Sequence, residues 1–162
     1  MDDALYGLAE EAGLALKAKG WMLATAESCT GGWVGEAVTA VSGSSSWYDR
    51  GFITYTNASK QEMLDVRSRT LESHGAVSEE TVREMAAGVL LHSQADISVA
   101  ISGIAGPTGG SPGKPVGTVC FAWGLRNGAL TSERRLFPGD RREVRRQAVE
   151  HALRGVLALI QT

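Results

Sequence analysis

The sequence predicts an α/β fold, specifically a three-layer α/β/α sandwich with helices on both faces of a mixed central sheet. Segments with a helical spacing of apolar residues alternate along the chain with short apolar runs typical of strands. Two of these runs lie close together within residues 116–137, which indicates that some strands are antiparallel. No repeat, low-complexity tail or linker divides the 162 residues, so we expect a single domain over residues 1–162.

The first half of the chain opens with an amphipathic segment. Residues 3–19 place leucine and alanine on one face at helical spacing, and Gly20 is a typical residue to end the helix. The elements expected after it are a strand over residues 22–26, a helix over residues 30–41, a loop over residues 42–46, a strand over residues 52–55 and a helix that carries Lys60 and Met63.

The second half begins with a helix capped by Ser78. Its first turn carries Glu79 and Glu80, and acidic side chains at this end of a helix are stabilised by the helix dipole. The elements expected after it are a strand over residues 97–101, a loop rich in glycine and proline over residues 102–115, and strands over residues 116–123 and 131–137. Asp140 and Glu143 have the spacing of a capping box, so we expect them to open the final helix.

Composition and charge exclude several classes of protein. The formal net charge is -2 and the one basic cluster lies within residues 141–146, so we expect no nucleic-acid partner. No apolar run approaches the roughly 20 residues of a membrane helix, so we expect no membrane partner. The sparse cysteines, Cys29 and Cys120, are typical of a reducing compartment. Because the acidic start also lacks the basic leader of a signal peptide, we expect a cytoplasmic protein.

A loop rich in glycine and hydroxyl side chains, residues 26–32, follows the first expected strand. At the start of a helix its backbone N–H groups would face an anion or a developing oxyanion. Ser28 would be a nucleophile there if a base lay close by. Alternatively, Ser28 or Thr30 only caps the helix while the glycines permit close packing, and the local sequence alone favours this second interpretation.

A second loop of this kind, residues 102–110, follows the strand over residues 97–101, at the end where open α/β sheets bind ligands. Its glycines would bring backbone amides against a phosphate. A plain surface loop is the alternative, but unstructured loops of this length are uncommon unless they are functional. The chain contains neither a Walker A loop nor a dinucleotide-binding fingerprint.

A base for Ser28 has to come from elsewhere in the chain. No histidine has the spacing of a zinc site, so we expect no metal, and each fits a surface or packing position better than a catalytic one. Lys60 is the better candidate if burial or a neighbouring cation lowers its pKa, and Tyr55 would donate or relay a proton. A solvated Lys60 and a core Tyr55 are the alternatives. Cys29 is a rival nucleophile, because a thiol at a helix start can have a lowered pKa.

Five segments in this order resemble the CinA C-terminal domain family. They are residues 26–32, residues 51–57 with Lys60, residues 74–78, residues 102–107 and residues 114–119. The resemblance spans nearly the whole chain and indicates the stand-alone form, without the larger N-terminal domain that some members carry. That family includes nicotinamide-nucleotide amidohydrolases, so the resemblance implies hydrolysis of nicotinamide mononucleotide (NMN) to nicotinate mononucleotide and ammonia, within pyridine-nucleotide (NAD) salvage. It also implies an α/β/α fold, no metal or other cofactor, and a homodimer.

The resemblance also implies roles for single residues. The family's catalytic serine, catalytic lysine and assisting tyrosine fall on Ser28, Lys60 and Tyr55. Arg141 is expected to face the substrate phosphate. Ser102 stands where many members have threonine and keeps the hydroxyl. The residues expected to bind the substrate are Thr30, Gly31, Asn57, Ser102, Gly103, Ala105, Gly106 and Arg141.

In the mechanism that we expect, a neutral Lys60 takes the proton of Ser28 with help from Tyr55, and Ser28 attacks the carboxamide carbon. Backbone amides at the start of the helix over residues 30–41 stabilise the oxyanion, and water then hydrolyses the acyl-enzyme. Two other functions stay open. One is a non-catalytic module that binds a pyridine nucleotide; the other is a nucleotide pyrophosphatase, which usually needs a divalent metal and clustered carboxylates.

Overall fold

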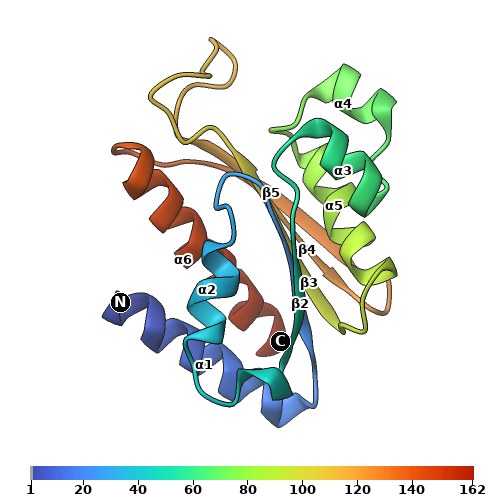
Figure 1. The fold of residues 1–162 in the computed structure, drawn as a ribbon, viewed down its shortest axis with the longest axis vertical. Coiled ribbons are helices and arrows are strands. Elements are labelled where there is room, and N and C mark those ends of the chain that lie inside the picture. Colours follow the sequence, from blue (N-terminus) through green and yellow to red (C-terminus); the bar gives the residue numbers. More distant parts are fainter. Residues whose placement is uncertain (1) are drawn as a thin grey trace.

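The computed structural model describes residues 2–162, so Met1, the first residue of the predicted domain, lies outside the described residues. Its centre is a five-stranded sheet with the strand order β2-β1-β3-β4-β5 (Figure 1). The strands are β1 (Leu23–Glu27), β2 (Tyr48–Ile53), β3 (Ile97–Gly103), β4 (Thr118–Leu125) and β5 (Leu130–Leu136). β1 runs parallel to β2 and β3, whereas β4 is antiparallel to β3 and β5, so the prediction of a mixed sheet is confirmed.

Helices cover both faces of this sheet (Figure 1). They are α1 (Asp3–Lys19), α2 (Trp33–Thr39), α3 (Asn57–Leu64), α4 (Ser68–His74), α5 (Glu79–Leu91) and α6 (Arg141–Ile160), with a short 3-10 helix, η1 (Ser44–Ser46), between α2 and β2. One cluster of buried apolar side chains joins α1, α2 and α6 to one face, and a second cluster joins α3, α4 and α5 to the other. The predicted three-layer α/β/α sandwich is confirmed.

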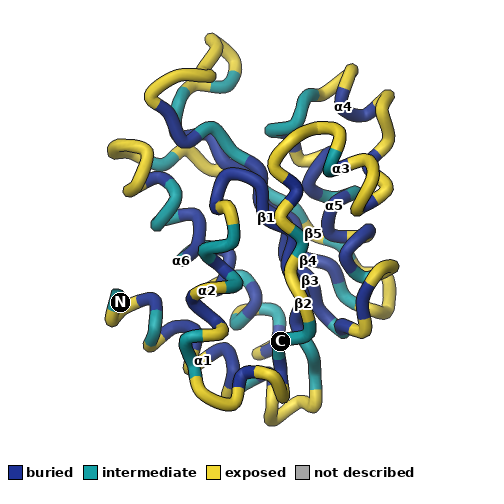
Figure 2. The backbone as a smooth tube through the Cα atoms, in the orientation of Figure 1, coloured by how far each residue is buried: buried dark blue, intermediate teal, exposed yellow. Residues whose placement is uncertain are grey.

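The three inner strands are buried from both sides (Figure 2). Every residue of β1 is buried, as is every residue of β3 and β4 except the last. Burial on both faces explains why these strands read as apolar runs without alternation. The two edge strands, β2 and β5, contain only intermediate and exposed residues. Within residues 2–162, no helix is long and apolar enough to cross a membrane.

Side-chain caps determine where four helices begin. Asp2, Thr56, Ser78 and Asp140 each accept a backbone N–H from the first turn of α1, α3, α5 and α6. The predicted cap at Ser78 is confirmed. At Asp140 the structure shows one half of the predicted capping box, in which the Glu143 N–H donates to the Asp140 carboxylate at 2.9 Å. A full capping box is found instead at the start of α3.

α2 is shorter than the predicted helix over residues 30–41. It begins at Trp33 and ends at Thr39. Gly31 and Gly32 have φ angles of +59° and +106°, which a right-handed helix does not accommodate, so the chain turns before the helix begins. The residues between β1 and α2 therefore form a tight turn, which matters for the site below.

Three further elements differ from their predictions. β2 begins at Tyr48 and ends at Ile53, instead of spanning residues 52–55, because pairing with β1 starts as soon as the chain leaves η1. β4 begins two residues later than the predicted 116–123, since the Thr118 N–H first closes a turn onto the Pro115 carbonyl. α4 is absent from the prediction, and its seven residues are too few for a recognisable helical pattern.

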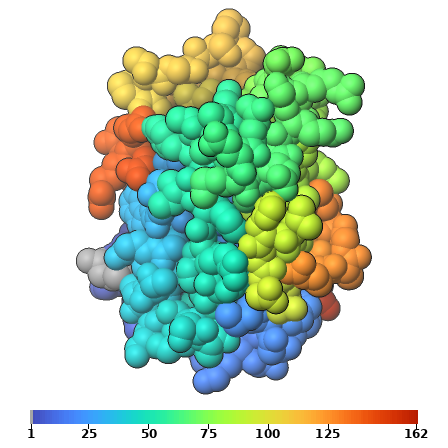
Figure 3. All heavy atoms as spheres, turned by 45° about the vertical axis from the view of Figure 1, so that its right-hand side comes forward, coloured from blue at the N-terminus to red at the C-terminus, as the bar shows by residue number. Residues whose placement is uncertain are grey.

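β1 is the strand at which the order of the sheet reverses. β2 lies on one side of β1, β3 lies on the other, and all three run in the same direction. Open α/β sheets bind ligands at the carboxyl ends of their strands beside such a point. The loop after β3, the segment from α3 to α4 and the start of α6 gather at this end of the molecule in the space-filling view (Figure 3).

Candidate active site

Ser28 and Lys60 meet at the carboxyl edge of the parallel strands. Ser28 is the first residue after β1, and its backbone N–H donates to the carbonyl of Ile101 on β3 at 3.0 Å. Lys60 belongs to α3, and its Nζ donates to Ser28 Oγ at 3.0 Å. Both residues are buried, and Lys60 is only 1% exposed. The structure therefore brings the predicted nucleophile and the predicted base into direct contact.

Two backbone carbonyls hold the end of the Lys60 side chain. Nζ donates to the oxygen of Thr54 at 2.9 Å and to the oxygen of Tyr55 at 3.2 Å. A carbonyl oxygen can only accept hydrogen bonds. When Nζ loses one proton, its two remaining N–H groups stay on these carbonyls and its lone pair faces Ser28 Oγ. This geometry is the one that a lysine base requires.

Burial lowers the pKa of Lys60 to about 8. The charged form is disfavoured because the ammonium has left water, while the two carbonyls still give it acceptors. At pH 7 the ammonium is the major form, so the neutral lysine of the expected mechanism is the minor species there. The neutral form becomes the major one above about pH 8.

Cys29, the rival nucleophile, is buried beside Ser28. Burial raises the pKa of its thiol to about 12. The thiolate is the nucleophilic form of cysteine, and it is scarcely populated at neutral pH under these conditions. The structure therefore favours Ser28 over Cys29.

A cavity of about 280 Å³ opens beside Ser28. Its lining residues are Ser28, Cys29, Tyr55, Asn57, Lys60, Ala76, Val77, Ser102, Gly103, Ala105 and Arg141. The three predicted catalytic residues and most of the predicted substrate-binding residues thus come together. Ala76 and Val77, from the connection between α4 and α5, are additional lining residues. The motif at residues 74–78 could have indicated them, but their apolar side chains carry no chemistry that marks a site in sequence.

Arg141 and Tyr55 contact one another at this cavity. Arg141 Nη1 donates to the carbonyl of Gly106 at 2.8 Å, and Arg141 Nη2 donates to the Tyr55 hydroxyl at 3.3 Å. Gly106 therefore reaches the site through its carbonyl without lining the cavity. Tyr55 is 60% exposed, so the alternative of a core tyrosine is wrong.

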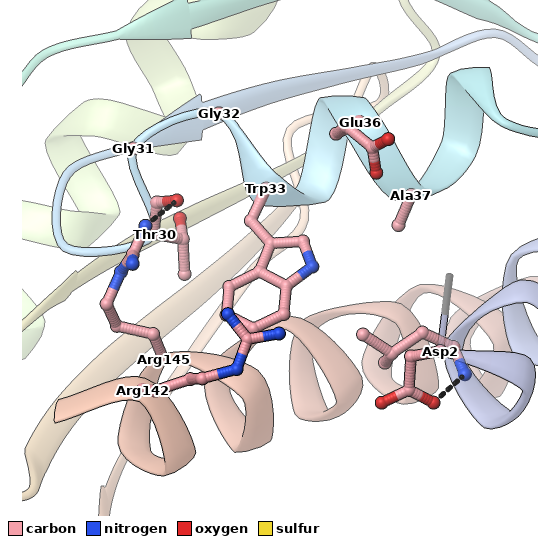
Figure 4. A pocket seen from close by; sticks show the side chains of 10 residues that line it. Asp2, Thr30, Gly31, Gly32, Trp33, Glu36, Ala37, Arg142 and Arg145 are labelled. Atoms are coloured by element: carbon pink, nitrogen blue, oxygen red, sulfur yellow. Dashed lines mark hydrogen bonds between the residues drawn. The ribbon is translucent and has the colours of Figure 1, made fainter. Parts of the chain in front are cut away.

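Thr30 and Gly31 line a different cavity, of about 770 Å³. Figure 4 shows this cavity between α2 and α6, with Trp33 on one side and Arg142 and Arg145 on the other. The chain reverses between the two cavities, since the Gly31 N–H donates to the Ser28 carbonyl at 3.1 Å. The structure therefore does not bring these two predicted substrate-binding residues into the Ser28 cavity.

The amides at the start of α2 already have an acceptor. The Glu27 carboxylate accepts the N–H of Gly32 at 3.1 Å, of Val34 at 2.9 Å and of Gly35 at 3.0 Å. A substrate oxyanion would have to displace this buried carboxylate to reach them. The expectation that the amides of this helix stabilise the oxyanion is therefore wrong for these three groups.

The histidines lie away from the Ser28 cavity. His74 faces Glu80 at 3.4 Å, His92 contacts Asp65 at 2.6 Å, and His151 contacts Glu133. His92 is the C-cap of α5. Across residues 2–162, the structure shows no group of three or more His, Cys, Asp or Glu side chains that is suited to hold a metal ion.

The chain is similar to known proteins over nearly its whole length. Residues 5–160 match the family described as CinA C-terminal domain. The chain is 55% identical over 152 residues to the nicotinamide-nucleotide amidohydrolase PncC of Escherichia coli K12, covering 94% of this chain and 92% of that protein. It is 49% identical to the protein of the same name from Pseudomonas putida, covering 97% of this chain and 98% of that protein.

A solved structure shows the same fold. The competence/damage inducible protein CihA of Agrobacterium tumefaciens superimposes with a TM-score of 0.93 at 45% sequence identity. The superposition covers 96% of this chain and 94% of that one.

Proposed function

The chain belongs to the CinA C-terminal domain family, and on that premise we propose that it is a nicotinamide-nucleotide amidohydrolase. It converts NMN and water to nicotinate mononucleotide and ammonia within NAD salvage. The observation that carries the chemistry is the 3.0 Å contact between Lys60 Nζ and Ser28 Oγ in a buried site. The name of the relatives from Escherichia coli and Pseudomonas putida supplies the substrate.

The reaction proceeds in two steps through an acyl-enzyme. Neutral Lys60 takes the proton of the Ser28 hydroxyl, and Ser28 Oγ forms a bond to the carboxamide carbon. Lys60 then returns the proton to the amide nitrogen, the C–N bond breaks, and ammonia leaves. A water molecule gives one proton to Lys60 and attacks the ester carbon; as the bond from this carbon to Ser28 Oγ breaks, Lys60 passes the proton to Ser28 Oγ and nicotinate mononucleotide leaves. Tyr55, whose backbone carbonyl fixes Lys60, assists the proton transfers.

The cavity offers polar contacts for the rest of the substrate. The Arg141 guanidinium contacts both the loop after β3, through Gly106, and the exposed Tyr55 hydroxyl. From this position it binds the phosphate of NMN as a fork of N–H donors. Asn57, Ser102, Gly103 and Ala105 complete the binding surface around the ribose and the pyridine ring.

We further propose that the protein acts in the cytoplasm as a homodimer, without a metal or other cofactor. Large apolar side chains at the edge strand and beside the site support the dimer: Ile53 is 54% exposed and Tyr55 is 60% exposed. A second copy that covers them would shield the cavity from water. The lysine and serine supply both proton transfer and nucleophile, so the reaction needs no metal-bound water.

The experiment that tests this function is ammonia release from NMN, with and without a chelator, by the wild type and by Ser28→Ala. We expect release that is insensitive to the chelator and that falls by at least about 1000-fold in Ser28→Ala. Release that survives Ser28→Ala would contradict the serine mechanism. Tight NMN binding without release would point to a binding module, and release that stops with chelator would point to a metal-dependent hydrolase.

A further inference from the structure

The turn that carries the nucleophile is held by two charged side chains that the reaction itself does not use. This turn comprises residues 28–31 and is closed by the bond from the Gly31 N–H to the Ser28 carbonyl. Glu27 precedes it on β1, and Arg145 reaches it from α6. Neither side chain lines the Ser28 cavity.

Glu27 is a buried carboxylate without a cationic partner among the described residues 2–162. It is 2% exposed, and both of its oxygens accept backbone N–H groups, from Gly32 and Val34 on Oε1 and from Gly35 on Oε2. These bonds tie the end of β1 to the beginning of α2, across the turn. A carboxylate at the N-terminal end of a helix is also stabilised by the helix dipole. The two ends of the Ser28 turn are thus fixed relative to one another.

Arg145 holds the middle of the turn. Its Nε donates to the Cys29 carbonyl at 2.9 Å, and its Nη2 donates to the Thr30 carbonyl at 3.2 Å. Figure 4 shows the guanidinium of Arg145 against Thr30. The neighbouring Arg142 also stacks over Trp33, with its guanidinium carbon 5.2 Å from the ring centroid, compared with 5.5 Å for Arg145. Within residues 2–162, Arg142 forms no hydrogen bond to the turn.

These contacts act on the backbone next to the nucleophile. The Cys29 carbonyl belongs to the residue directly after Ser28, and the Ser28 N–H donates to the Ile101 carbonyl at 3.0 Å. With the backbone fixed on both sides, Ser28 Oγ keeps its place 3.0 Å from Lys60 Nζ.

We propose that Glu27 and Arg145 are positioning residues that hold the Ser28 turn so that Ser28 Oγ stays directed at Lys60 and the cavity. This inference rests on the proposed function. A nucleophile gains rate from its orientation only if it is aimed before the reaction. The two charged side chains supply that aim from opposite sides of the turn.

The first test compares Arg145→Ala with Arg142→Ala as its matched control. Both substitutions remove a guanidinium that stacks on Trp33, and only the first removes the two carbonyl contacts. We expect kcat for NMN to fall by about 10- to 100-fold in Arg145→Ala, with KM changed by less than about threefold. The pH midpoint of kcat/KM should stay unchanged, because the contacts of Lys60 are intact. We expect Arg142→Ala to match the wild type in kcat.

The second test uses Glu27→Gln with Glu84→Gln as its control. Glu84 is a carboxylate that also accepts a backbone N–H, from Arg67 at 2.9 Å, but it lies on α5, away from the cavity. A side-chain amide at position 27 has one acceptor oxygen where the carboxylate has two, so it cannot hold all three N–H groups at the start of α2. Glu27→Gln should therefore lose kcat by a similar factor, whereas Glu84→Gln should lose only thermal stability. Circular dichroism at the assay temperature shows whether each variant is folded, and so separates a loss of kcat from a loss of stability.

A covalent probe makes the outcome independent of the substrate. Phenylmethanesulfonyl fluoride forms a bond from sulfur to Ser28 Oγ as the S–F bond breaks, fluoride leaves and Lys60 takes the proton. Slower labelling of Arg145→Ala than of Arg142→Ala, measured by intact mass, supports the proposal even if NMN is not turned over. Equal labelling and equal kcat in the two variants would overturn it, as would a rise in KM alone. A wild type that is neither labelled nor active overturns both this proposal and the proposed function.

Discussion

The side chain of Lys60 contacts the hydroxyl of Ser28 although the two residues are separated by 32 positions in the chain. The contact joins two layers of the sandwich, since Ser28 follows β1 and Lys60 belongs to α3. It combines a buried amine with a hydroxyl that has one face on a cavity. The pKa of the amine and the identity of its partners lead to specific expectations.

The pH dependence of turnover should follow Lys60. Burial lowers its pKa to about 8, and only the neutral amine can accept the proton of Ser28. We therefore expect kcat/KM to rise with pH, with a midpoint near 8, and to fall about tenfold for each pH unit below 7. Ammonia release at NMN concentrations well below KM, from pH 6 to 10, measures this profile.

The control for this profile is Lys60→Arg, which keeps a positive charge that is not lost in the same pH range. Its kcat should be at least about 100-fold lower at every pH. A profile of wild-type shape in Lys60→Arg would show that another group sets the midpoint.

Arg141→Ala should weaken the recognition of a phosphate. Loss of a hydrogen bond to a charged group costs about 1.5–3 kcal/mol, so kcat/KM for NMN should fall by about 10- to 100-fold. Nicotinamide riboside lacks the phosphate, and its kcat/KM should change by less than about threefold. Steady-state kinetics on both substrates gives the comparison. Equal losses on the two would place Arg141 at the pyridine or ribose end of the cavity instead.

Cys29→Ala should remain active. The thiol is buried, with its pKa raised to about 12, so it is not the attacking group. We expect kcat within about threefold of the wild type and a loss of about 1 kcal/mol in the free energy of unfolding from the deleted atom. Ammonia release and urea unfolding measure the two quantities. A loss of activity as large as that of Ser28→Ala would reverse the assignment of the nucleophile.

Alanine substitutions at two helix glycines should change the stability of the protein in opposite directions. At Gly88, in α5, an added Cβ would lie 2.1 Å from the backbone oxygen of Leu64 at the end of α3. Gly88→Ala should therefore destabilise the protein by about 1–3 kcal/mol or more, because backbone has to move. At Gly7, in α1, nothing described lies within 4 Å, and Gly7→Ala should stabilise by about 0.5–1 kcal/mol. Thermal unfolding of both variants checks the pair, and a destabilised Gly7→Ala would contradict it.

The local features of this protein follow from its amino-acid sequence alone. Apolar periodicity predicted the alternation of helices and strands, and the Ser78 cap followed from a hydroxyl and two acids adjacent in the chain. The resemblance to the CinA C-terminal domain family pointed to Ser28 and Lys60 as the residues to test, whereas the local sequence alone favoured a capping role for Ser28. Helices, strands and caps depend on interactions within a few residues, so the order of amino acids is enough to reveal them. The boundaries of α2 and β2 were less accessible, because a glycine turn and strand pairing shift them.

The groups that are available for chemistry become apparent only in the folded structure. The spacing of residues 26–32 predicted free amides at the start of α2, but Glu27 folds back and occupies three of them. The same strand-to-turn segment places Cys29 in the core and sends Thr30 and Gly31 to another cavity. Arg145 comes 117 positions after Ser28 in the sequence and still fixes the nucleophile turn. Burial, pKa values and hydrogen-bond partners depend on contacts that form only when the layers pack together. A local sequence pattern does not contain these contacts.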